Sequence, residues 1–344
     1  MTAKYWQKGE VLDYKASAAV KNGEVVSLGT RIGVAGEDIA AGETGHLHVV
    51  GVFEMEKATG DVTMGAALYY SATDKKITTT ASGNVPAGYA AAPAASADEN
   101  VLVSPLTADV LRAGLEIGEK TGGALDITLY AVSQLWDYKS ENPQVPDEAA
   151  VRAALEKSGR GRVCVEGNSV CTGGTQLDLG AIAKGAVGDE VMACLKEQGV
   201  ICALVNLGGN ILTLGEKADG SPWTIAVDSP FGEGYAGRIE LGSGKAVATS
   251  SGAQRYFEKD GVVYHHILDP ETGYPARSGL ASVTVIADDG LTADALSTAL
   301  FVAGEAQAAR ILEEQYPKVG AVLIRDDGSI RTLGDVCFTE EAGA

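Results

Sequence analysis

The chain has 344 residues, a length that accommodates two domains of ordinary size. It carries 46 Asp and Glu residues against 27 Lys and Arg, and this net charge of −19 argues against non-specific binding to nucleic acid. Hydrophobic residues make up 45%, which argues against wholesale disorder, and no stretch approaches the ~18 apolar residues of a membrane helix. We therefore expect a globular protein with no nucleic-acid partner and no membrane segment.

The N-terminus and the cysteines give little sign of export. Residues 1–10 contain neither an apolar core nor a small-residue cleavage site, so we expect no signal peptide and a cytoplasmic protein. Five cysteines, without a Cys-x-x-Cys pair, argue against a disulfide framework or a zinc knuckle. Cys164 and Cys171 are expected to be small buried apolar residues or unreactive thiols.

Residues 1–105 are predicted to form short strands. Short apolar and β-branched runs alternate with glycine, which is typical of a small all-β barrel or sandwich. The runs lie at 24–28, 31–34, 46–50, 67–70 and 76–80. Residues 90–100 are small and polar, and we expect them to form a loop or linker.

The same region resembles the phage capsid-cement, or head-decoration, family. The resemblance runs along residues 4–105 and depends on the order and spacing of segments 9–14, 18–26, 38–45, 51–54 and 83–89. It implies a small β module that binds a capsid lattice or self-associates. It also gives the virion as an alternative location for the protein.

From residue 106 onward the pattern changes to alternating helices and strands. Apolar residues at helical spacing predict helices at 107–118, behind a Thr107 cap, and at 146–157. Apolar and β-branched runs predict strands at 203–206, 223–227 and 282–286. This alternation indicates an α/β or α+β core with functional residues in its loops.

Segment 176–185 has features of a phosphate site. A glycine-flanked turn that opens a helix exposes backbone N–H groups, and Lys184 adds a positive charge. The spacing of a Walker loop is absent. The plainer interpretation, which this segment alone favours, is a helix start with Asp178 near its cap and Lys184 in solvent.

Asp294 and Thr298 lie four residues apart, so on a helix they share one face. Carboxylate and hydroxyl oxygens are suitable ligands for Mg²⁺ when phosphate oxygens complete its coordination shell. The alternative, which this pair alone favours, puts Asp294 near a helix N-cap and lets Thr298 bond back to a carbonyl.

His265 and His266 are adjacent on a predicted strand, so they point to opposite faces and do not easily share one metal ion. One of them can act as a general base near neutral pH, while residues 269–273 are also typical of a simple turn. Glycines in segments 121–128 and 205–210 allow the backbone to approach a ligand closely, or merely form turns.

Taken together, these motifs resemble the ApbE family of FAD:protein FMN transferases. The resemblance covers residues 107–338, where the family's motifs occur in order. The matching segments are 121–126, 135–136, 178–185, 206–210, 222–223, 266–273 and 293–298. It implies an enzyme that moves FMN from FAD to a Ser or Thr of an acceptor protein and releases AMP.

Carried over position by position, the resemblance also implies the site residues. The FAD-binding positions, the first three of which contact the flavin, are Ala124, Leu125, Asp126, Asp178, Lys184 and Ile267. The Mg²⁺ ligands are the Ala181 carbonyl and the side chains of Asp294 and Thr298. Lys184 would meet the diphosphate, and His266 occupies the position of the base.

The two resemblances imply a multidomain chain. A small all-β N-terminal module, residues 1–105, precedes an α+β flavin transferase core, residues 106–344, which lacks the family's usual N-terminal segment. The family's Thr-Ser-Gly-Asp-Tyr-Glu-Arg-Tyr segment corresponds here to residues 249–256, which lose one acid and one tyrosine.

Two other functions stay open on the sequence alone. One is an FAD pyrophosphatase, in which water replaces the acceptor hydroxyl and the products are FMN and AMP. The other is a phage capsid decoration protein with a catalytically inactive appended domain. A join of two gene fragments near residue 105 would also explain the change of family.

Overall fold

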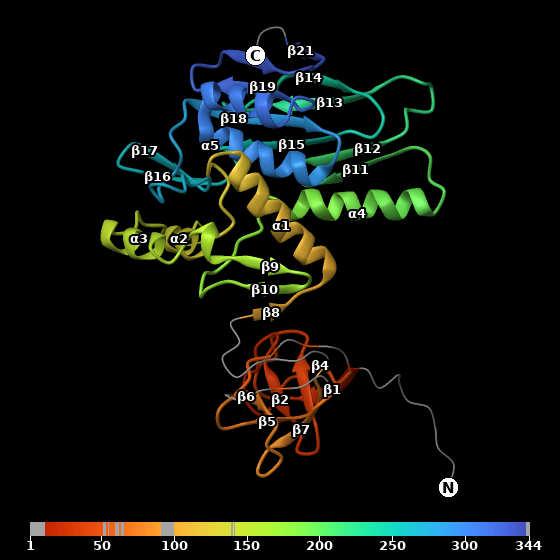
Figure 1. Ribbon diagram of the computed structural model, residues 1–344, viewed down its shortest axis with the longest axis vertical. Helices are drawn as coiled ribbons and strands as arrows, with labels where there is room; N and C mark the ends of the chain where they lie inside the picture. The colour runs from red at the N-terminus through yellow and green to blue at the C-terminus, as the bar shows by residue number, and fades with distance from the viewer. Residues whose placement is uncertain are drawn as a thin grey trace. The chain divides into compact units, whose positions relative to one another are not determined.

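In the computed structural model the chain forms two compact units, residues 1–100 and 101–344 (Figure 1). The described residues are 11–50, 53, 55–58, 62, 65–90, 100–138, 140 and 142–341. The N-terminal segment 1–10, for which no signal peptide was expected, and most of the predicted linker at 90–100 lie outside them. The predicted domain limits, 1–105 and 106–344, stay a prediction.

The first unit contains seven strands within its described residues. A four-stranded sheet has the order β1-β4-β3-β2 and a three-stranded sheet the order β6-β5-β7, both antiparallel. The strands are β1 Val11–Lys15, β2 Val25–Ser27, β3 Ile32–Ala35, β4 Thr44–His48, β5 Ala67–Ser71, β6 Lys76–Thr78 and β7 Val85–Tyr89. They overlap all five predicted runs, and Ala35, Ile39 and Leu47 pack in the core of the unit.

The second unit is built on a six-stranded antiparallel sheet with the order β11-β12-β15-β18-β19-β20. Its strands are β11 Ala203–Leu207, β12 Asn210–Leu214, β15 Ala246–Ser251, β18 Leu280–Ala287, β19 Gly320–Arg325 and β20 Ile330–Leu333. The inner strand β18 is buried along nearly its whole length. A strand buried on both faces requires cover on both sides of the sheet.

Helices cover one face of this sheet (Figure 1). They are α1 Pro105–Lys120, α4 Ala183–Glu197 and α5 Gly290–Gln315. Leu111 of α1, Leu296 of α5 and Val285 of β18 belong to the main apolar core between these layers. Helix α5 bends at Gly304, whose φ of 74° is a left-handed conformation that glycine adopts without strain. No helix in the described part of the chain is both long and apolar enough to cross a membrane.

A second, three-stranded sheet covers the other face. Its strands, in the order β13-β14-β21, are β13 Trp223–Asp228, β14 Tyr235–Leu241 and β21 Phe338–Glu340. Ile225 and Ile239 of this sheet pack against Val322 and Ile324 of β19. The second unit therefore has a helix layer, a central sheet and an outer sheet. This confirms the mixed α and β architecture predicted for this part of the chain.

Smaller elements surround this core. They are β8 Asn100–Leu102, α2 Tyr130–Trp136, α3 Glu148–Leu155, the 3-10 helix Arg160–Arg162, β9 Cys164–Glu166, β10 Ser169–Cys171, β16 Tyr256–Lys259 and β17 Val262–His265. Strands β8, β10 and β9 form one sheet, and β16 pairs with β17. Trp136 is fully buried, contacts the rings of Phe257, Tyr264 and Tyr274, and donates its Nε1–H to the Gly273 carbonyl at 3.0 Å.

Two local expectations are wrong. Helix α1 begins with Pro105 rather than Thr107, and Ser104 Oγ caps it by accepting from the Thr107 N–H at 3.1 Å. Proline suits the first helical position because the missing N–H would have no partner there. Cys164 is exposed and Cys171 is partly exposed, so the expectation that they are buried apolar residues is wrong, while the alternative of unreactive thiols is not tested.

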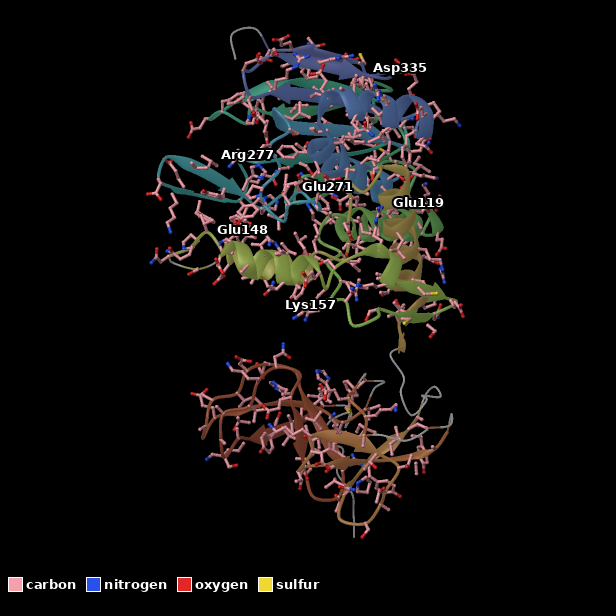
Figure 2. All side chains as sticks on the ribbon, turned by 60° about the vertical axis from the view of Figure 1, so that its left-hand side comes forward. Glu119, Glu148, Lys157, Glu271, Arg277 and Asp335 are labelled. Atoms are coloured by element: carbon pink, nitrogen blue, oxygen red, sulfur yellow. The ribbon has the colours of Figure 1, made fainter. Side chains whose placement is uncertain are left out.

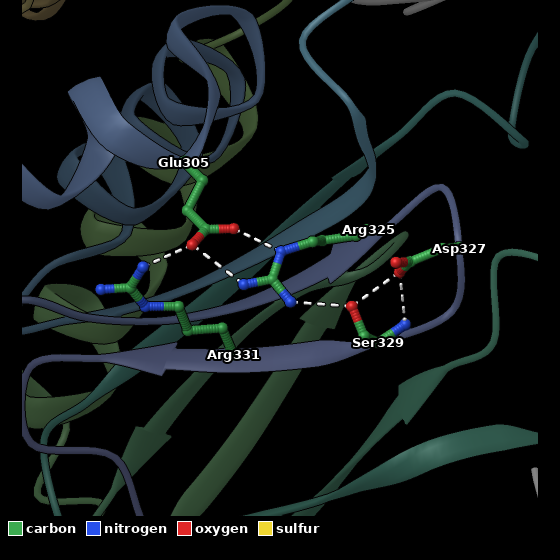
Figure 3. Close-up of polar contacts among 5 residues, drawn as sticks. All are labelled: Glu305, Arg325, Asp327, Ser329 and Arg331. Atoms are coloured by element: carbon green, nitrogen blue, oxygen red, sulfur yellow. Dashed lines mark hydrogen bonds and ion pairs between the residues drawn. The ribbon is translucent and has the colours of Figure 1, made fainter.

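A charged network ties α5 to the end of the central sheet (Figure 3). Glu305 of α5 accepts hydrogen bonds from Arg325 of β19 and Arg331 of β20, and Arg325 also donates to Ser329 Oγ at 2.7 Å. The two arginines lower the pKa of Glu305 from 4.5 to about 2. A carboxyl with a lowered folded-state pKa stabilises the fold above its unfolded pKa and loses that contribution as pH falls through the folded value.

Glu305→Gln should lower the melting temperature of the second unit by a few degrees at pH 7, because the substitution removes the negative charge between two arginines. The difference from the unsubstituted protein should shrink as the pH falls from about 4.5 to about 2. Thermal unfolding across this pH range measures both effects. Glu313→Gln, at an exposed position of the same helix, is the control; a pH-independent difference at Glu305 would contradict the assignment.

Candidate active site

Helices α4 and α5 cross at a point where neither has a side chain. A Cβ atom on Gly185 would lie 2.0 Å from the Gly290 carbonyl oxygen, so only glycine permits this approach. Gly185 donates its backbone N–H to Asp294 Oδ2 at 2.9 Å. The first turn of α4 is thereby joined to a side chain of α5.

Asp189 makes a second connection between the same helices. Its carboxylate oxygens accept from the backbone N–H groups of Gly290 at 2.6 Å and Leu291 at 2.9 Å. Burial raises the pKa of Asp189, and these two hydrogen bonds partly offset the rise. Because a helix N-terminus favours an anion, Asp189 fixes the start of α5 against α4.

Asp294 is a buried carboxyl, only 5% exposed. Burial raises its pKa, and the amide of Asn210, the Gly185 N–H and the charge of Lys184 partly offset the rise. Lys184 Nζ donates to Asn210 Oδ1 at 3.1 Å, while Asn210 Nδ2 is buried without a hydrogen bond of normal geometry to any described residue. The carboxylate therefore has only partial compensation for its charge, which favours a cation beside it.

Hydroxyl groups continue this polar surface one turn along α5. Thr298 Oγ1 lies 3.0 Å from Ser250 Oγ of β15, and Ser250 Oγ lies 2.8 Å from Ser297 Oγ. Ser297 donates to the Asp294 carbonyl at 2.8 Å. Asp294 and Thr298 thus share a face of α5 with further hydroxyl oxygens, as their spacing predicts.

The plainer interpretation of this pair is wrong. The N-cap of α5 is Asp289, whose Oδ1 accepts from the Thr292 N–H at 2.7 Å. Asp294 lies inside the helix, and the residue that bonds back to a carbonyl is Ser297 rather than Thr298.

His266 follows β17 and is half-buried. Its Nδ1 lies 3.2 Å from the Arg255 carbonyl oxygen, and its backbone N–H donates to the same carbonyl at 3.0 Å. A carbonyl only accepts, so Nδ1 carries the proton and Nε2 keeps a lone pair.

Burial lowers the pKa of His266, and the charges of Arg255 and Lys184 lower it further against the opposing hydrogen bond to Arg255. The imidazole is therefore neutral near pH 7. Since Lys184 acts on the pKa of both His266 and Asp294, these three groups lie in one region of the fold.

His265 has a different environment. It is buried, its Nε2 lies 3.0 Å from the Ala276 carbonyl oxygen, and its ring packs edge-on against Phe301. Burial lowers its pKa to about 4. His265 is therefore a core residue, and of the two only His266 remains a candidate base.

The acidic residues predicted to bind FAD lie on adjacent segments. Asp126 Oδ1 accepts from the Thr128 N–H at 2.8 Å and from its hydroxyl at 2.6 Å. Asp178 donates its backbone N–H to the Ile127 carbonyl at 2.7 Å. The loop after α1 and the segment before α4 therefore lie side by side.

Two predicted FAD-contact residues are largely internal. Leu125 and Ile267 are 2% and 5% exposed and belong to the main core. Ala124 and Ala181 are partly buried and pack against the same core. Contacts from Leu125 or Ile267 to a ligand would therefore come mainly from the backbone.

Within the described ranges, no three His, Cys, Asp or Glu side chains are close enough to hold a metal ion together. The predicted magnesium ligands include only one such side chain, Asp294, so this absence does not test them. The magnesium site stays a prediction.

The sequence interpretation missed three participants. Asn210 was noticed only through the glycines before it, although it accepts the hydrogen bond from Lys184. Ser250 and Arg255 lie in segment 249–256, which departs from the family pattern and yet contacts both Thr298 and His266.

A separate cavity of about 450 Å³ lies between α3 and the turn after His266. Its lining includes Glu148 and Arg152 of α3 together with Glu271 and Tyr274; Figure 2 labels the two glutamates. None of the residues predicted to bind FAD or Mg²⁺ lines it. This cavity is therefore distinct from the candidate site.

Known proteins resemble this chain in sequence and in fold. The model of the ApbE family matches residues 73–323, well over half of the chain. The chain belongs to the ApbE family. A phage cement protein model matches residues 6–105, which supports the resemblance of the N-terminal segment. Binding of that segment to a capsid lattice stays a prediction.

Curated relatives carry the name FAD:protein FMN transferase. The Treponema pallidum protein is 35% identical over 245 residues, covering 66% of this chain and 67% of that protein. The Rhodobacter capsulatus protein is 35% identical over 243 residues, but the chain spans only 46% of its length. These relatives support the enzyme class predicted from the sequence, a flavin transferase.

Solved structures show the same core. The ApbE protein of Thermotoga maritima has a TM-score of 0.63 and 38% identity, covering 69% of this chain and 78% of that one. The flavin transferase ApbE from Vibrio cholerae has a TM-score of 0.60 and 33% identity, covering 68% and 76%. The mixed fold of the second unit is therefore that of ApbE proteins.

Gly185→Ala should destabilise the second unit by about 2–3 kcal/mol, because the new methyl group meets backbone at the helix crossing. Gly188→Ala, three residues along α4, is the matched variant; its methyl group meets the end of the Leu212 side chain rather than backbone, so it should cost less than Gly185→Ala. Urea unfolding of both variants measures the difference. Equal costs would show that the crossing does not depend on glycine.

Proposed function

We propose that this chain transfers FMN from FAD to a Ser or Thr hydroxyl of an acceptor protein, with release of AMP and with bound Mg²⁺. The observation that carries the proposal is the α4–α5 crossing, where the Gly185 N–H binds the buried Asp294 carboxylate and Lys184 Nζ donates to Asn210 at 3.1 Å. His266 lies close enough for the charge of Lys184 to lower its pKa. Relatives named FAD:protein FMN transferase support the choice of reaction.

The residues of the crossing fit a hard cation. A buried carboxylate with a raised pKa, the hydroxyl of Thr298 and the neighbouring Ser250 supply oxygen donors, which Mg²⁺ prefers. Asp294, Thr298 and the Ala181 carbonyl would hold the ion. When bound, Mg²⁺ supplies positive charge that neutralises diphosphate oxygens.

Lys184 has the reach and the charge for the diphosphate. Its side chain is exposed at the first turn of α4, where the helix dipole also favours an anion. Its hydrogen bond to Asn210 holds the ammonium group toward Asp294. We assign it to orienting the two phosphates of FAD.

His266 supplies the base. In the proposed step the acceptor hydroxyl oxygen bonds to the FMN-side phosphorus, the bond from that phosphorus to the bridging oxygen breaks, and AMP leaves with that oxygen. The hydroxyl proton moves to Nε2 of His266. The low pKa of this histidine keeps Nε2 unprotonated before the step.

Asp126 and Asp178 are assigned to hydrogen bonds with FAD. Both carboxylates are held by nearby backbone N–H groups, Asp126 by Thr128 and Asp178 by Gly180 at 2.8 Å. Fixed carboxylates of this kind accept hydrogen bonds from a ligand without losing further conformational entropy. Ala124, Leu125 and Ile267 are assigned to backbone and edge contacts with FAD.

The test uses purified protein, FAD, MgCl₂ and, as acceptor, a protein substrate of the Vibrio cholerae transferase. A covalent fluorescent flavin on the acceptor together with equimolar AMP is the expected result. Release of AMP and FMN without an adduct would select an FAD pyrophosphatase. Intact FAD and no FAD binding would contradict both enzyme functions and favour a structural role.

Asp294→Asn should reduce transfer by about 100-fold or more, because it removes the charge that holds the cation. Asparagine keeps an oxygen that accepts the Gly185 N–H, so the fold should persist; the melting temperature checks this. The control is Asp327→Asn, in a surface turn beside Ser329, which should leave transfer unchanged. Transfer by Asp294→Asn at the unsubstituted rate would refute the metal assignment.

A further inference from the structure

The β9–β10 hairpin places two cysteines opposite each other. Cys164 of β9 and Cys171 of β10 are direct partners in the antiparallel register. Residues in such a position have Cα atoms ~4.5–5.5 Å apart and side chains on the same face of the ladder. Disulfides have Cα atoms ~4.4–6.8 Å apart, and the spacing of such strand partners falls within this range.

We propose that Cys164 and Cys171 are an oxidation site that forms a reversible disulfide within one chain. The proposal is independent of flavin transfer. Both thiols are free; Cys164 is exposed and Cys171 is partly exposed. Val165 and Val170, on the opposite face of the hairpin, pack with the main core, which keeps the cysteines on the outer side.

The β9–β10 hairpin is held both at its turn and along one edge. Arg112 of α1 donates to the Gly167 carbonyl at the turn, and β8 pairs with the other edge of β10. Cys164 Sγ lies 3.9 Å from Glu166 Oε1, to which its S–H donates a weak hydrogen bond along the outer face of β9.

The other cysteines provide an internal comparison. Cys194, Cys202 and Cys337 are also exposed, so an oxidant reaches them. Cys194 lies in α4, and Cys202 and Cys337 directly precede β11 and β21, so among the described residues none of the three has a cysteine as its strand partner. Cys164 and Cys171 therefore differ from the other cysteines by facing each other across the hairpin, not by being exposed.

The proposed oxidant is a peroxide. The Cys164 thiolate attacks hydrogen peroxide, an S–O bond forms as the O–O bond breaks, and one water leaves after protonation. The Cys171 thiolate then attacks the Cys164 sulfur, the S–S bond forms as the S–O bond breaks, and a second water leaves. The two thiol protons end in the two water molecules. Two equivalents of an added thiol then reduce the disulfide to the two cysteines by exchange and are themselves oxidised to a disulfide.

The test uses the full chain with Cys194, Cys202 and Cys337 replaced by Ser. After treatment with hydrogen peroxide and alkylation of free thiols, trypsin cuts after Arg162 and Lys184, so both cysteines lie in one peptide, 163–184. The expected peptide is not alkylated and is lighter by two hydrogens. A second protease that cuts after Glu166 should leave two fragments joined until a reductant separates them.

Cys171→Ser in the same background is the matched control and should give oxygen addition or alkylation at Cys164 without a link. The unsubstituted protein, treated in parallel, gauges the dose through oxidation of Cys194. Two alkylated thiols, oxygen on both sulfurs, or links only between chains at a dose that oxidises Cys194 would overturn the proposal.

Discussion

The candidate site depends on the close crossing of α4 and α5. Two glycines, Gly185 and Gly290, remove the side chains that would separate the helices, and Asp294 accepts a backbone N–H at the first turn of α4. Asp189 repeats this arrangement in the opposite direction, from α4 to the N-terminus of α5. Each helix thus supplies the anion that the start of the other requires.

The same crossing determines the electrostatics of the site. The crossing buries Asp294, and this burial raises the pKa of its carboxyl. Lys184, which directly precedes Gly185, stays exposed. The buried Asp294 carboxylate therefore favours binding of a cation, and the exposed Lys184 ammonium group favours binding of an anion. His266 comes from a separate hairpin, and Arg255 fixes its tautomer through a backbone carbonyl.

Much of the second unit was predictable because its elements carry strong local patterns. Buried strands such as β18 are continuous apolar runs, and Asp294 and Thr298 share a face because α5 is a regular helix at that point. Thr107 gives the wrong start for α1, because Pro105 suits the first helical position and Ser104 caps the helix ahead of it.

Other features depend on tertiary neighbours and could not be predicted from local sequence. The role of Asp189 exists only because α5 begins beside it. Ser250 and Arg255 act through partners distant in sequence. The cysteine pair required the register of the β9–β10 hairpin, since a shift by one residue would put the two thiols on different faces.

The most direct measurement is a crystal structure of the protein with FAD and Mn²⁺, located by anomalous scattering. The account predicts one ion bound by the Asp294 carboxylate and the Thr298 hydroxyl, with the FAD diphosphate between that ion and Lys184 and His266 beside the FMN-side phosphorus. Binding of FAD elsewhere, or an ion with no contact to Asp294, would contradict it.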